Sequence, residues 1–432
     1  MSNDEYGICE DCTNLKTGSL WCNTCNAKRL KDEFPKWTSG NNEIDGYIQE
    51  SQLKCKNNDE FVEWIPFERF KDVEFIASGG FGSVFKATWM DGYIDFWSNT
   101  DKRWKRNKKG LAVCLKSLHN SMNNIKGFLE EVDSQMRLRK IVYTISIYGI
   151  TKNPKENDYM MVMDYAKGGN LRKTLKENAN KLTWKDKLVI LQSIITGLDE
   201  IHRAGMVHKD FHSGNIVMES LTCACITDFG LCKPIGGAHD AESTNIYGVL
   251  AYVAPEVLKG REYTKASDIY SFGIVMSEVL TGNPPYHEIP HDGKLATKIC
   301  MGYRPKIRCK VPQLFLDLMN KCQDAIPENR PTSQEIHETI YKYWVDLFDS
   351  DSESEISKQC KEIEKSGANL STHDPGKSTA SNYTTNLHSI YTSQLLDYRN
   401  LPEPVNSTAE IKQLEYRIQD ISIVDDEDDE EQ

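Results

Sequence analysis

The chain has 432 residues, of which 39% are apolar and 27% are charged, a composition typical of a folded protein with two or three domains. No stretch approaches the roughly 20 consecutive apolar residues that a membrane span needs, and the acidic start at Met1–Glu5 is unlike a secretory signal. The net charge of −12 belongs to residues 346–432, which hold 20 acidic and 7 basic side chains, so the nearly neutral remainder gives no general reason to expect a nucleic-acid partner.

Four cysteines near the N-terminus form two closely spaced pairs. Cys9 and Cys12 are followed after nine residues by Cys22 and Cys25, and two Cys-x2-Cys pairs suit tetrahedral Zn²⁺. We therefore expect residues 1–36 to form a zinc-ribbon-like segment, which is too small to fold without metal. Free or redox-active cysteines are the alternative. The 13 cysteines of the whole chain are too scattered for a disulfide scaffold, which predicts a reducing compartment, the cytoplasm, with the nucleus left open.

The next two segments differ in their apolar periodicity. Residues 37–66 are predicted to form a connector with one short helix, whereas residues 67–345 are periodic throughout. Within this body, strand-like runs occur at 73–77, 83–87, 112–116 and 159–163, and helical spacing occurs at 124–139, 184–204 and 268–281. Strands first and helices later predict an α+β body with a β-rich first lobe and a helical second lobe.

A glycine-rich turn joins the first two predicted strands and reads Ala77-Ser78-Gly79-Gly80-Phe81-Gly82-Ser83-Val84. Glycines let backbone N–H groups approach a phosphate without a Cβ clash, although hairpin glycines without a ligand are common. Lys116 follows on an apolar strand, where its amine would either point inward at phosphates or extend from the surface. Glu131, on the next predicted helix, can supply the acid that favours the inward orientation.

Residues 102–109 form a strongly basic stretch that contains a tryptophan. A nucleic-acid or acidic-peptide site would have this composition. We favour a solvated loop between two strands, because runs of like charge stay hydrated.

The strongest chemical signal is the run His208-Lys209-Asp210-Phe211-His212-Ser213-Gly214-Asn215, followed by Asp228-Phe229-Gly230. Such polar groups between apolar segments are costly to bury unless they hold a cation or accept a proton. The pattern suits phosphoryl transfer, with Asn215 and Asp228 holding Mg²⁺ and Asp210 orienting the attacking hydroxyl. Turn-forming Asp and Asn residues are the alternative, which Ala254-Pro255-Glu256 further along the chain disfavours.

The C-terminal segment, residues 346–432, is rich in Ser, Thr, Asn and acidic residues and poor in large apolar ones. This composition predicts a disordered acidic tail, and seven consecutive acids at 425–431 would stay solvated. One short apolar patch within it is best able to dock on another surface, and it consists of Ile390, Tyr391, Leu395, Leu396 and Tyr398.

Together these motifs resemble a eukaryotic protein kinase domain of the tyrosine-kinase-like branch, over residues from about 70 to 345. The resemblance implies a bilobal fold that uses ATP and Mg²⁺. Lys116 would grip the α- and β-phosphates and pair with Glu131, with Glu130 as the alternative partner. The nucleotide site that the resemblance implies is made of Ala77, Ser78, Gly79, Gly80, Phe81, Gly82, Ser83, Val84, Cys114, Lys116, Met163 as gatekeeper, and Asp164 and Ala166 in the hinge.

The resemblance also implies roles outside the nucleotide site. Asp210 would be the catalytic base. Glu256 matches the acid that pairs with an arginine near the end of the domain, here Arg330, and Asp268 matches the buried aspartate that braces the catalytic loop. The activation segment would run from Asp228 to Glu256, and its candidate phosphorylation sites are Ser243, Thr244 and Tyr247.

Four positions depart from the family's pattern. Ala77 replaces the first loop glycine, and Cys114 replaces the alanine usually found above adenine. Lys209 replaces the catalytic-loop arginine and loses its bidentate fork. His212 stands where serine/threonine kinases have lysine and tyrosine kinases have alanine or arginine. Hydroxyl specificity is therefore open, with Ser/Thr favoured over Tyr.

We interpret the sequence as an ATP-dependent protein kinase that acts on protein substrates in signal transduction. The alternatives are a catalytically inactive pseudokinase that serves as a scaffold, and an adaptor that acts mainly through its zinc segment. The N-terminal segment and connector also look like those of kinase families expanded in root-symbiotic fungi. Neither nucleic acid nor a membrane span is expected, and the oligomeric state is left open.

Overall fold

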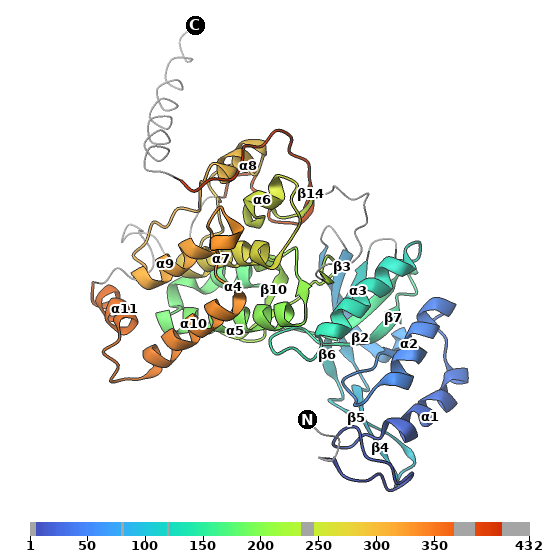
Figure 1. Ribbon diagram of the computed structural model, residues 1–432. Helices are drawn as coiled ribbons and strands as arrows, with labels where there is room; N and C mark the ends of the chain where they lie inside the picture. The colour runs from blue at the N-terminus through green and yellow to red at the C-terminus, as the bar shows by residue number, and fades with distance from the viewer. Residues whose placement is uncertain (1–5, 79–81, 119–120, 235–245, 367–384, 408–432) are drawn as a thin grey trace. The chain divides into compact units, whose positions relative to one another are not determined.

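The computed structural model describes residues 6–78, 82–118, 121–234, 246–366 and 385–407, which fall into two compact units (Figure 1). The first unit comprises the residues up to Gly169 together with Thr196–His208 and Asn215–Lys233. The second comprises Asn170–Ile195, Lys209–Gly214 and the residues from Pro234 onward. A β-rich first unit and a helical second unit confirm the predicted α+β class.

The first unit is built on a six-stranded sheet. In order across the sheet, the strands are β1 (Glu63–Trp64), β7 (Ile147–Lys152), β8 (Tyr159–Asp164), β6 (Leu111–Leu118), β3 (Gly82–Trp89) and β2 (Phe70–Ser78). The β1–β7 pair is parallel and the other neighbours are antiparallel. Two short strands, β10 (Ile216–Met218) and β11 (Ala224–Ile226), form a separate hairpin in this unit.

The alternation of β6 decides which side chains face the helix that covers the sheet. Val113 and Leu115 are fully buried in one core, while Cys114 packs against the core on the other face, which also holds α3 (Ile125–Leu138). Because successive residues of a strand point to opposite faces, Lys116 lies on the α3 face as well.

The N-terminal segment packs against a β-hairpin inserted between β3 and β6. This hairpin is formed by β4 (Tyr93–Ser98) and β5 (Arg103–Asn107). The ring of Trp104 stacks on Trp21 at 5.6 Å between centroids, beside the helix α1 (Asn23–Glu33). The prediction of a solvated loop at 102–109 is wrong for the β5 residues, because the aromatic side chains give this basic strand an apolar surface to cover.

The second unit is mostly helical, and its central helix is α7 (Lys265–Thr281). Every residue of α7 from Ser267 to Leu280 is buried. Thr264 and Ser267 form a capping box at its start, and Gly282 ends it with a φ of +76°. Besides α11 (Glu355–Lys365), which is described below, the other helices that contribute residues to the described part of this unit are α4 (Leu171–Asn178), α5 (Trp184–Arg203, continuing into the first unit), α6 (Pro255–Leu258), α8 (Gly293–Cys300), α9 (Gln313–Cys322) and α10 (Ser333–Phe348).

One more helix precedes the sheet, and several short elements are spread along the chain. The connector between the N-terminal segment and the sheet carries α2 (Asn42–Lys54). The other strands and 3-10 helices are β9 (Met206–Val207), β12 (Lys233–Pro234), η2 (Phe34–Lys36), η3 (Phe67–Arg69), η4 (Ala179–Lys181), η5 (Ser213–Asn215), η6 (Leu250–Tyr252) and η7 (Pro327–Asn329). Among the helices in the described ranges, none combines the length and the apolar character that crossing a membrane requires.

Part of the segment predicted to be disordered is folded, which corrects that prediction. A further helix, α11 (Glu355–Lys365), buries Ile356 and Cys360. Residues 385–407 belong to the second unit, in which β14 (Gln394–Leu396) pairs with β13 (Ile246–Gly248). The stretches 367–384 and 408–432, including the acidic run at 425–431, lie outside the described residues.

Candidate active site

Three charged side chains from separate elements of the first unit meet beside the sheet. The Nζ atom of Lys116 on β6 lies 2.8 Å from Oε1 of Glu131 on α3 and 2.8 Å from Oδ1 of Asp228. Lys116 and Glu131 are both buried. Glu130, the alternative partner, is exposed and lies 3.8 Å from Lys126 on the outer face of the helix. The face of α3 that packs on the sheet therefore carries Glu131, and not Glu130, to Lys116.

The electrostatics of this cluster keep the lysine charged. Burial by itself would lower the pKa of Lys116, but the carboxylates of Asp228 and Glu131 raise it well above its usual range. Burial raises the pKa of Glu131, and Lys116 opposes that effect. One buried cation between two acids is thus a preformed charge cluster, able to receive an anionic ligand in place of one acid.

Asn215 and Asp228 come together at the base of the β10–β11 hairpin. Ile216 pairs with Ile226, and the backbone N–H of Thr227 donates to the carbonyl of Asn215 at 3.0 Å. Asp228 follows with a left-handed φ of 65°. Carboxylate and amide oxygens are the ligands that Mg²⁺ prefers, so this pair of residues fits a magnesium ion.

Gly230 shows why the turn after Asp228 needs a glycine. A Cβ atom at Gly230 would lie 2.9 Å from Oε2 of Glu131, so a larger residue would push the acid away from Lys116. The intervening Phe229 is fully buried, and its ring lies 5.4 Å from that of His208. The Asp-Phe-Gly turn is therefore anchored by its phenylalanine and kept close to α3 by its glycine.

The residues of the predicted nucleotide site lie on adjacent strands. Val84 on β3 pairs with Lys116 on β6, and Cys114 on β6 pairs with Met163 on β8. Gly82 approaches the neighbouring strand so closely that a Cβ would lie 1.8 Å from a carbonyl oxygen. Ala77 and Ser78 end β2, and Ser78 and Ser83 place their hydroxyl oxygens 3.3 Å apart. Three predicted residues lie outside the described part of the chain: Gly79, Gly80 and Phe81.

The predicted hinge follows directly on β8. The carboxylate of Asp164 accepts a hydrogen bond from the hydroxyl of Tyr148, and its backbone N–H donates to Ser146 at 2.9 Å. Burial raises the pKa of Asp164. Ala166 packs against the α3-side core. These contacts fix the backbone at the end of β8.

Asp210 lies in the second unit, where a braced loop presents its carboxylate. The backbone N–H of Lys209 donates to Oδ1 of Asp268 at 3.1 Å, and Asp268 is buried in α7. Lys209 itself has a φ of 69°, a left-handed conformation for which a firm support is needed. Oδ2 of Asp210 lies 3.5 Å from Nε2 of His212 and accepts a hydrogen bond from Ser393.

A buried ion pair also stabilises the second unit. The guanidinium of Arg330 and the carboxylate of Glu256 make two hydrogen bonds of 2.7 Å each, and both side chains are almost completely buried. The remaining guanidinium N–H groups donate to backbone carbonyls, among them those of Asp324 and Ala266 at 2.8 Å. This fork tethers α6, which contains Glu256, to the loop before α10.

The three candidate phosphorylation sites have different outcomes. Tyr247 lies on β13, where its carbonyl accepts a hydrogen bond from the hydroxyl of Tyr263 at 2.6 Å. Ser243 and Thr244 lie outside the described residues.

Sequence reasoning did not single out two residues of the second unit, one beside Asp210 and one on α4. Ser393 contacts its carboxylate, and Arg172 on α4 lies against Tyr391. The signal that could have found them was the apolar patch around Tyr391, which we noted as a docking segment without assigning it a surface.

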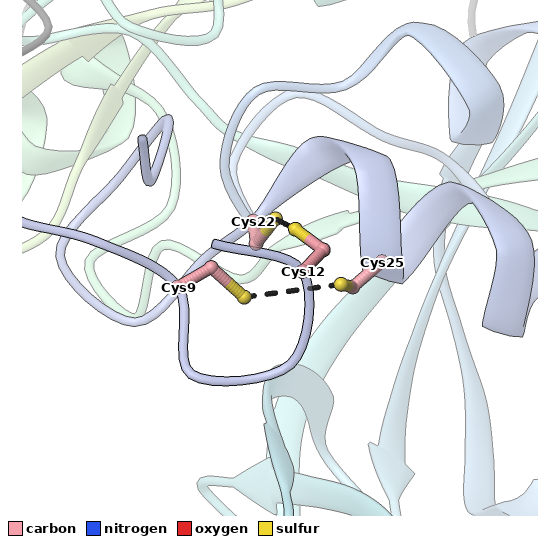
Figure 2. Close-up of side chains that lie close together, drawn as sticks. All are labelled: Cys9, Cys12, Cys22 and Cys25. Carbon is pink, nitrogen blue, oxygen red and sulfur yellow. Dashed lines mark hydrogen bonds between the residues drawn. The ribbon is translucent and has the colours of Figure 1, made fainter. Parts of the chain in front are cut away.

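The four N-terminal cysteines gather at one point, as Figure 2 shows. Sγ of Cys9 lies 3.8 Å from that of Cys25, Sγ of Cys12 lies 3.6 Å from that of Cys22, and all four sulfurs are within 4.8 Å of one another. A tetrahedral Zn²⁺ site with Zn–S bonds of about 2.3 Å has S···S edges of roughly 3.8 Å. Cys22 is the N-cap residue of α1, and Cys25 lies in the first turn of that helix.

Thiol acidity differs within this cluster. Burial raises the pKa of Cys22 and Cys25. At Cys9, backbone hydrogen bonds from Asp11 and Cys12 outweigh the effect of burial and lower the pKa to about 7. A metal ion would have one ligand that deprotonates readily near neutral pH.

Comparison with known proteins gives consistent matches. Residues 70–340 match the family described as protein tyrosine and serine/threonine kinase. The chain is 30% identical over 297 residues to mouse receptor-interacting serine/threonine-protein kinase 4, which covers 66% of this chain and 34% of that protein. It is also 30% identical over 275 residues to a probable leucine-rich repeat receptor-like protein kinase of Arabidopsis thaliana, covering 60% of this chain and 26% of that protein. A probable serine/threonine-protein kinase of Dictyostelium discoideum, mkcD, is 30% identical over 283 residues, covering 63% of this chain and 39% of the relative. The chain thus spans less than two-fifths of the length of these relatives.

Proposed function

The chain belongs to the protein tyrosine and serine/threonine kinase family, and from that premise we propose that it transfers the γ-phosphoryl group of ATP to serine or threonine hydroxyls of proteins. The observation that carries the proposal is the buried cluster of Lys116, Glu131 and Asp228. Such a cluster is costly to maintain in a purely structural role.

Each residue has a role in this proposal. Lys116 binds the α- and β-phosphates, and Glu131 holds its amine in place. Asn215 and Asp228 supply oxygen ligands for Mg²⁺, which when bound would neutralise charge on the phosphates. The hinge backbone at Asp164 and Ala166 would bind adenine, with Cys114 above the ring.

Asp210 acts on the other substrate. Its carboxylate accepts a hydrogen bond from a hydroxyl group in the structure, which is the contact that a phosphoryl acceptor would make. It would orient that hydroxyl and take its proton as the bond to phosphorus forms. The brace from Asp268 fixes the loop so that the carboxylate needs no rearrangement.

The hydroxyl specificity and the branch of the family are finer proposals. We favour Ser/Thr because the relatives named above are called serine/threonine or receptor-like kinases, and this also supports the tyrosine-kinase-like branch. A pseudokinase is disfavoured, because Lys116, Asp210, Asn215 and Asp228 are all present. The link to kinase families of root-symbiotic fungi stays a prediction.

Phosphoryl transfer that depends on Mg²⁺ tests the proposal. The full chain, incubated with radiolabelled ATP, Mg²⁺ and a generic acceptor protein, is expected to label serine or threonine. Chelation with EDTA should abolish labelling, and excess Mg²⁺ alone should restore it, because the Asn215 and Asp228 oxygens hold the ion. Phosphoamino-acid analysis identifies the hydroxyl. Labelling that persists in EDTA, or its complete absence with Mg²⁺, would contradict the assignment.

We also propose that the four-cysteine cluster binds one Zn²⁺ ion and holds the N-terminal segment on the first unit. The sulfur distances fit the metal, and the attached α1 reaches the rest of the unit through Trp21 and Arg29. The Trp21 ring stacks on Phe61 at 5.7 Å, and the Arg29 guanidinium lies 4.7 Å from the Trp97 ring. Zinc would therefore be structural, as in closed four-thiolate sites.

Metal analysis of the full chain tests the zinc proposal. We expect about one equivalent of zinc per chain after purification under reducing conditions, and less than about half an equivalent in Cys22→Ser. Loss of zinc should also change tryptophan fluorescence, because Trp21 and Trp104 stack beside the site. Cys309→Ser, which removes a partly buried thiol outside the cluster, is the matched control and should keep its zinc. Normal fluorescence and folding without any metal would exclude a structural zinc.

A further inference from the structure

The tail segment 385–407 lies along the second unit and adds a strand to the activation segment. β14 pairs antiparallel with β13, with Leu396 opposite Ile246, Leu395 opposite Tyr247 and Gln394 opposite Gly248. An extended peptide that extends a sheet edge in this way is a recurring mode of peptide recognition. The strand therefore has the form of a bound peptide that happens to be part of the same chain.

The residue that precedes this strand lies on the catalytic carboxylate. Oγ of Ser393 donates a hydrogen bond to Oδ2 of Asp210 at 2.5 Å. Ser389, a neighbouring hydroxyl, donates instead to the carbonyl of Ile289 at 2.8 Å. The tail thus brings Ser393 to Asp210 in the arrangement expected for an acceptor hydroxyl and its base.

His212 completes a chain of hydrogen bonds through Ser393. Nδ1 of His212 accepts the backbone N–H of Gly214 at 3.0 Å, so the neutral ring carries its proton on Nε2. Nε2 lies 3.2 Å from Oγ of Ser393 and donates to it. The hydroxyl proton of Ser393 is therefore directed at Asp210, while a lone pair of its oxygen is left to attack.

Contacts of Tyr391 fix the part of the tail that precedes Ser393. The guanidinium of Arg172 lies 4.5 Å from the centre of the Tyr391 ring and donates to the Tyr391 carbonyl at 3.1 Å. The ring of His291 packs edge-on at 4.8 Å. The hydroxyl of Tyr391 reaches the carbonyl of Pro285 at 2.9 Å. Arg172 is itself fixed, because its Nε lies 3.6 Å from Oε1 of Glu278 inside the unit.

Leu396 and Gly248 fix the part of the tail that follows Ser393. Leu396 is 4% exposed, whereas Leu395 on the opposite side of the strand is 50% exposed. On the partner strand, Gly248 has a φ of +151°, and a Cβ there would lie 3.1 Å from Val253 and 3.5 Å from Oδ1 of Asp210. A side chain at Gly248 would therefore crowd Val253, and its Cβ would be in van der Waals contact with the Asp210 carboxylate.

Contacts after β14 also hold the tail segment 385–407 in place. Lys259 donates to the carbonyl of Leu401 at 2.8 Å and pairs with Glu403 at 3.2 Å. The side chain of Asn406 accepts the backbone N–H of Ala325 at 2.8 Å. The segment is thus held at both ends, and Ser393 is not placed by its own hydrogen bond alone.

We propose that Ser393 is an intramolecular autophosphorylation site, and that the kinase prefers acceptor hydroxyls with an aromatic residue two positions before and a leucine three positions after. The inference rests on the kinase activity proposed above. Oγ of Ser393 attacks the γ-phosphorus of ATP, the bond between that phosphorus and the bridging oxygen of ADP breaks, and the hydroxyl proton passes to Asp210. The products are phosphoserine 393 and ADP, and the proton is later released to solvent.

Mass spectrometry of the phosphatase-treated full chain, followed in time with Mg-ATP, tests the proposal. Ser393 should be phosphorylated with a rate constant that does not depend on protein concentration. Ser393→Ala should lose this phosphopeptide, and the matched control Thr392→Ala, which changes the exposed neighbouring hydroxyl, should keep it. Leu396→Ala should slow the modification by about tenfold or more, because it removes a buried anchor. Leu387→Ala changes a leucine that is 97% exposed and should not slow it.

Two further measurements separate failure of this inference from failure of the kinase assignment. A generic acceptor protein is present in every reaction, and a mass-tagged Lys116→Met chain, unable to transfer phosphate, is mixed with wild type. Modification within the same molecule leaves Ser393 of the tagged chain unlabelled. Labelling of the acceptor protein without Ser393, or labelling of Ser393 on the tagged chain at the wild-type rate, overturns the inference and leaves the kinase assignment standing. Absence of all labelling overturns both.

Discussion

Replacing Asp210 by asparagine is expected to lower kcat for phosphoryl transfer by about 10²–10⁴-fold, the range typical of losing a general base. Asparagine has the same size as aspartate and its side-chain oxygen can still accept a hydrogen bond from a hydroxyl. It cannot take the proton of that hydroxyl. The loss should therefore fall on kcat, with little change in the KM for ATP, because the charge cluster of Lys116, Glu131 and Asp228, which we propose binds the phosphates, is untouched.

Folding should be preserved in this variant, which makes the result interpretable. The brace runs from the backbone of Lys209 to Asp268 and does not involve the Asp210 carboxylate. Asp317→Asn, at an exposed site on α9, is the matched control and should keep wild-type activity. Steady-state kinetics and thermal unfolding are measured on the three proteins side by side. A kcat for Asp210→Asn within about threefold of wild type would show that Asp210 is not the base.

The fold was predictable where short-range patterns carry it. The alternation of β6 follows from Val113 and Leu115 on one face and Cys114 on the other, and it places Lys116 toward the helix that was predicted next. The choice between Glu130 and Glu131 needed the actual face of α3. Two adjacent positions on a helix differ by about 100° in direction, and sequence spacing alone could not decide which one points at the sheet.

The sequence predicted which residues form the candidate site, but it did not predict most of the contacts among them. The motif around Asp210 predicted a base and its loop, whereas the hydrogen bond from Lys209 to Asp268 depends on how α7 packs. The prediction of a solvated loop around Trp104 was wrong because charged residues dominate the composition of this short stretch. The apolar surface that it covers includes Trp21, which lies more than 80 positions earlier in the chain.

The tail was misjudged for a related reason. Composition averaged over residues 346–432 is polar, and that average hides one short apolar segment. In this segment, Tyr391 packs against Arg172 and Leu396 is buried. The pairing of β13 with β14 joins residues almost 150 positions apart. No local propensity encodes such a pairing, because its stability comes from contacts with α4 and with β13.

Replacing Arg330 by methionine is expected to lower the free energy of unfolding by about 3–5 kcal/mol. The guanidinium is completely buried and makes two hydrogen bonds to Glu256, so its removal leaves a carboxylate uncompensated inside the second unit. The backbone carbonyls of Asp324 and Ala266 lose their donor as well. Urea unfolding, followed by far-UV circular dichroism, measures the change.

The reason for this large effect is burial rather than the ion pair as such, and controls can separate the two. Arg308→Met removes an exposed pair with Glu288 and should cost no more than about 1 kcal/mol. The double variant Arg330→Met with Glu256→Leu should be more stable than Arg330→Met alone, since it also removes the stranded charge. If Arg330→Met costs no more than Arg308→Met, the buried fork does not stabilise the unit. A double variant less stable than either single one would mean instead that packing around Tyr270, whose ring lies 5.2 Å from the guanidinium, carries the effect.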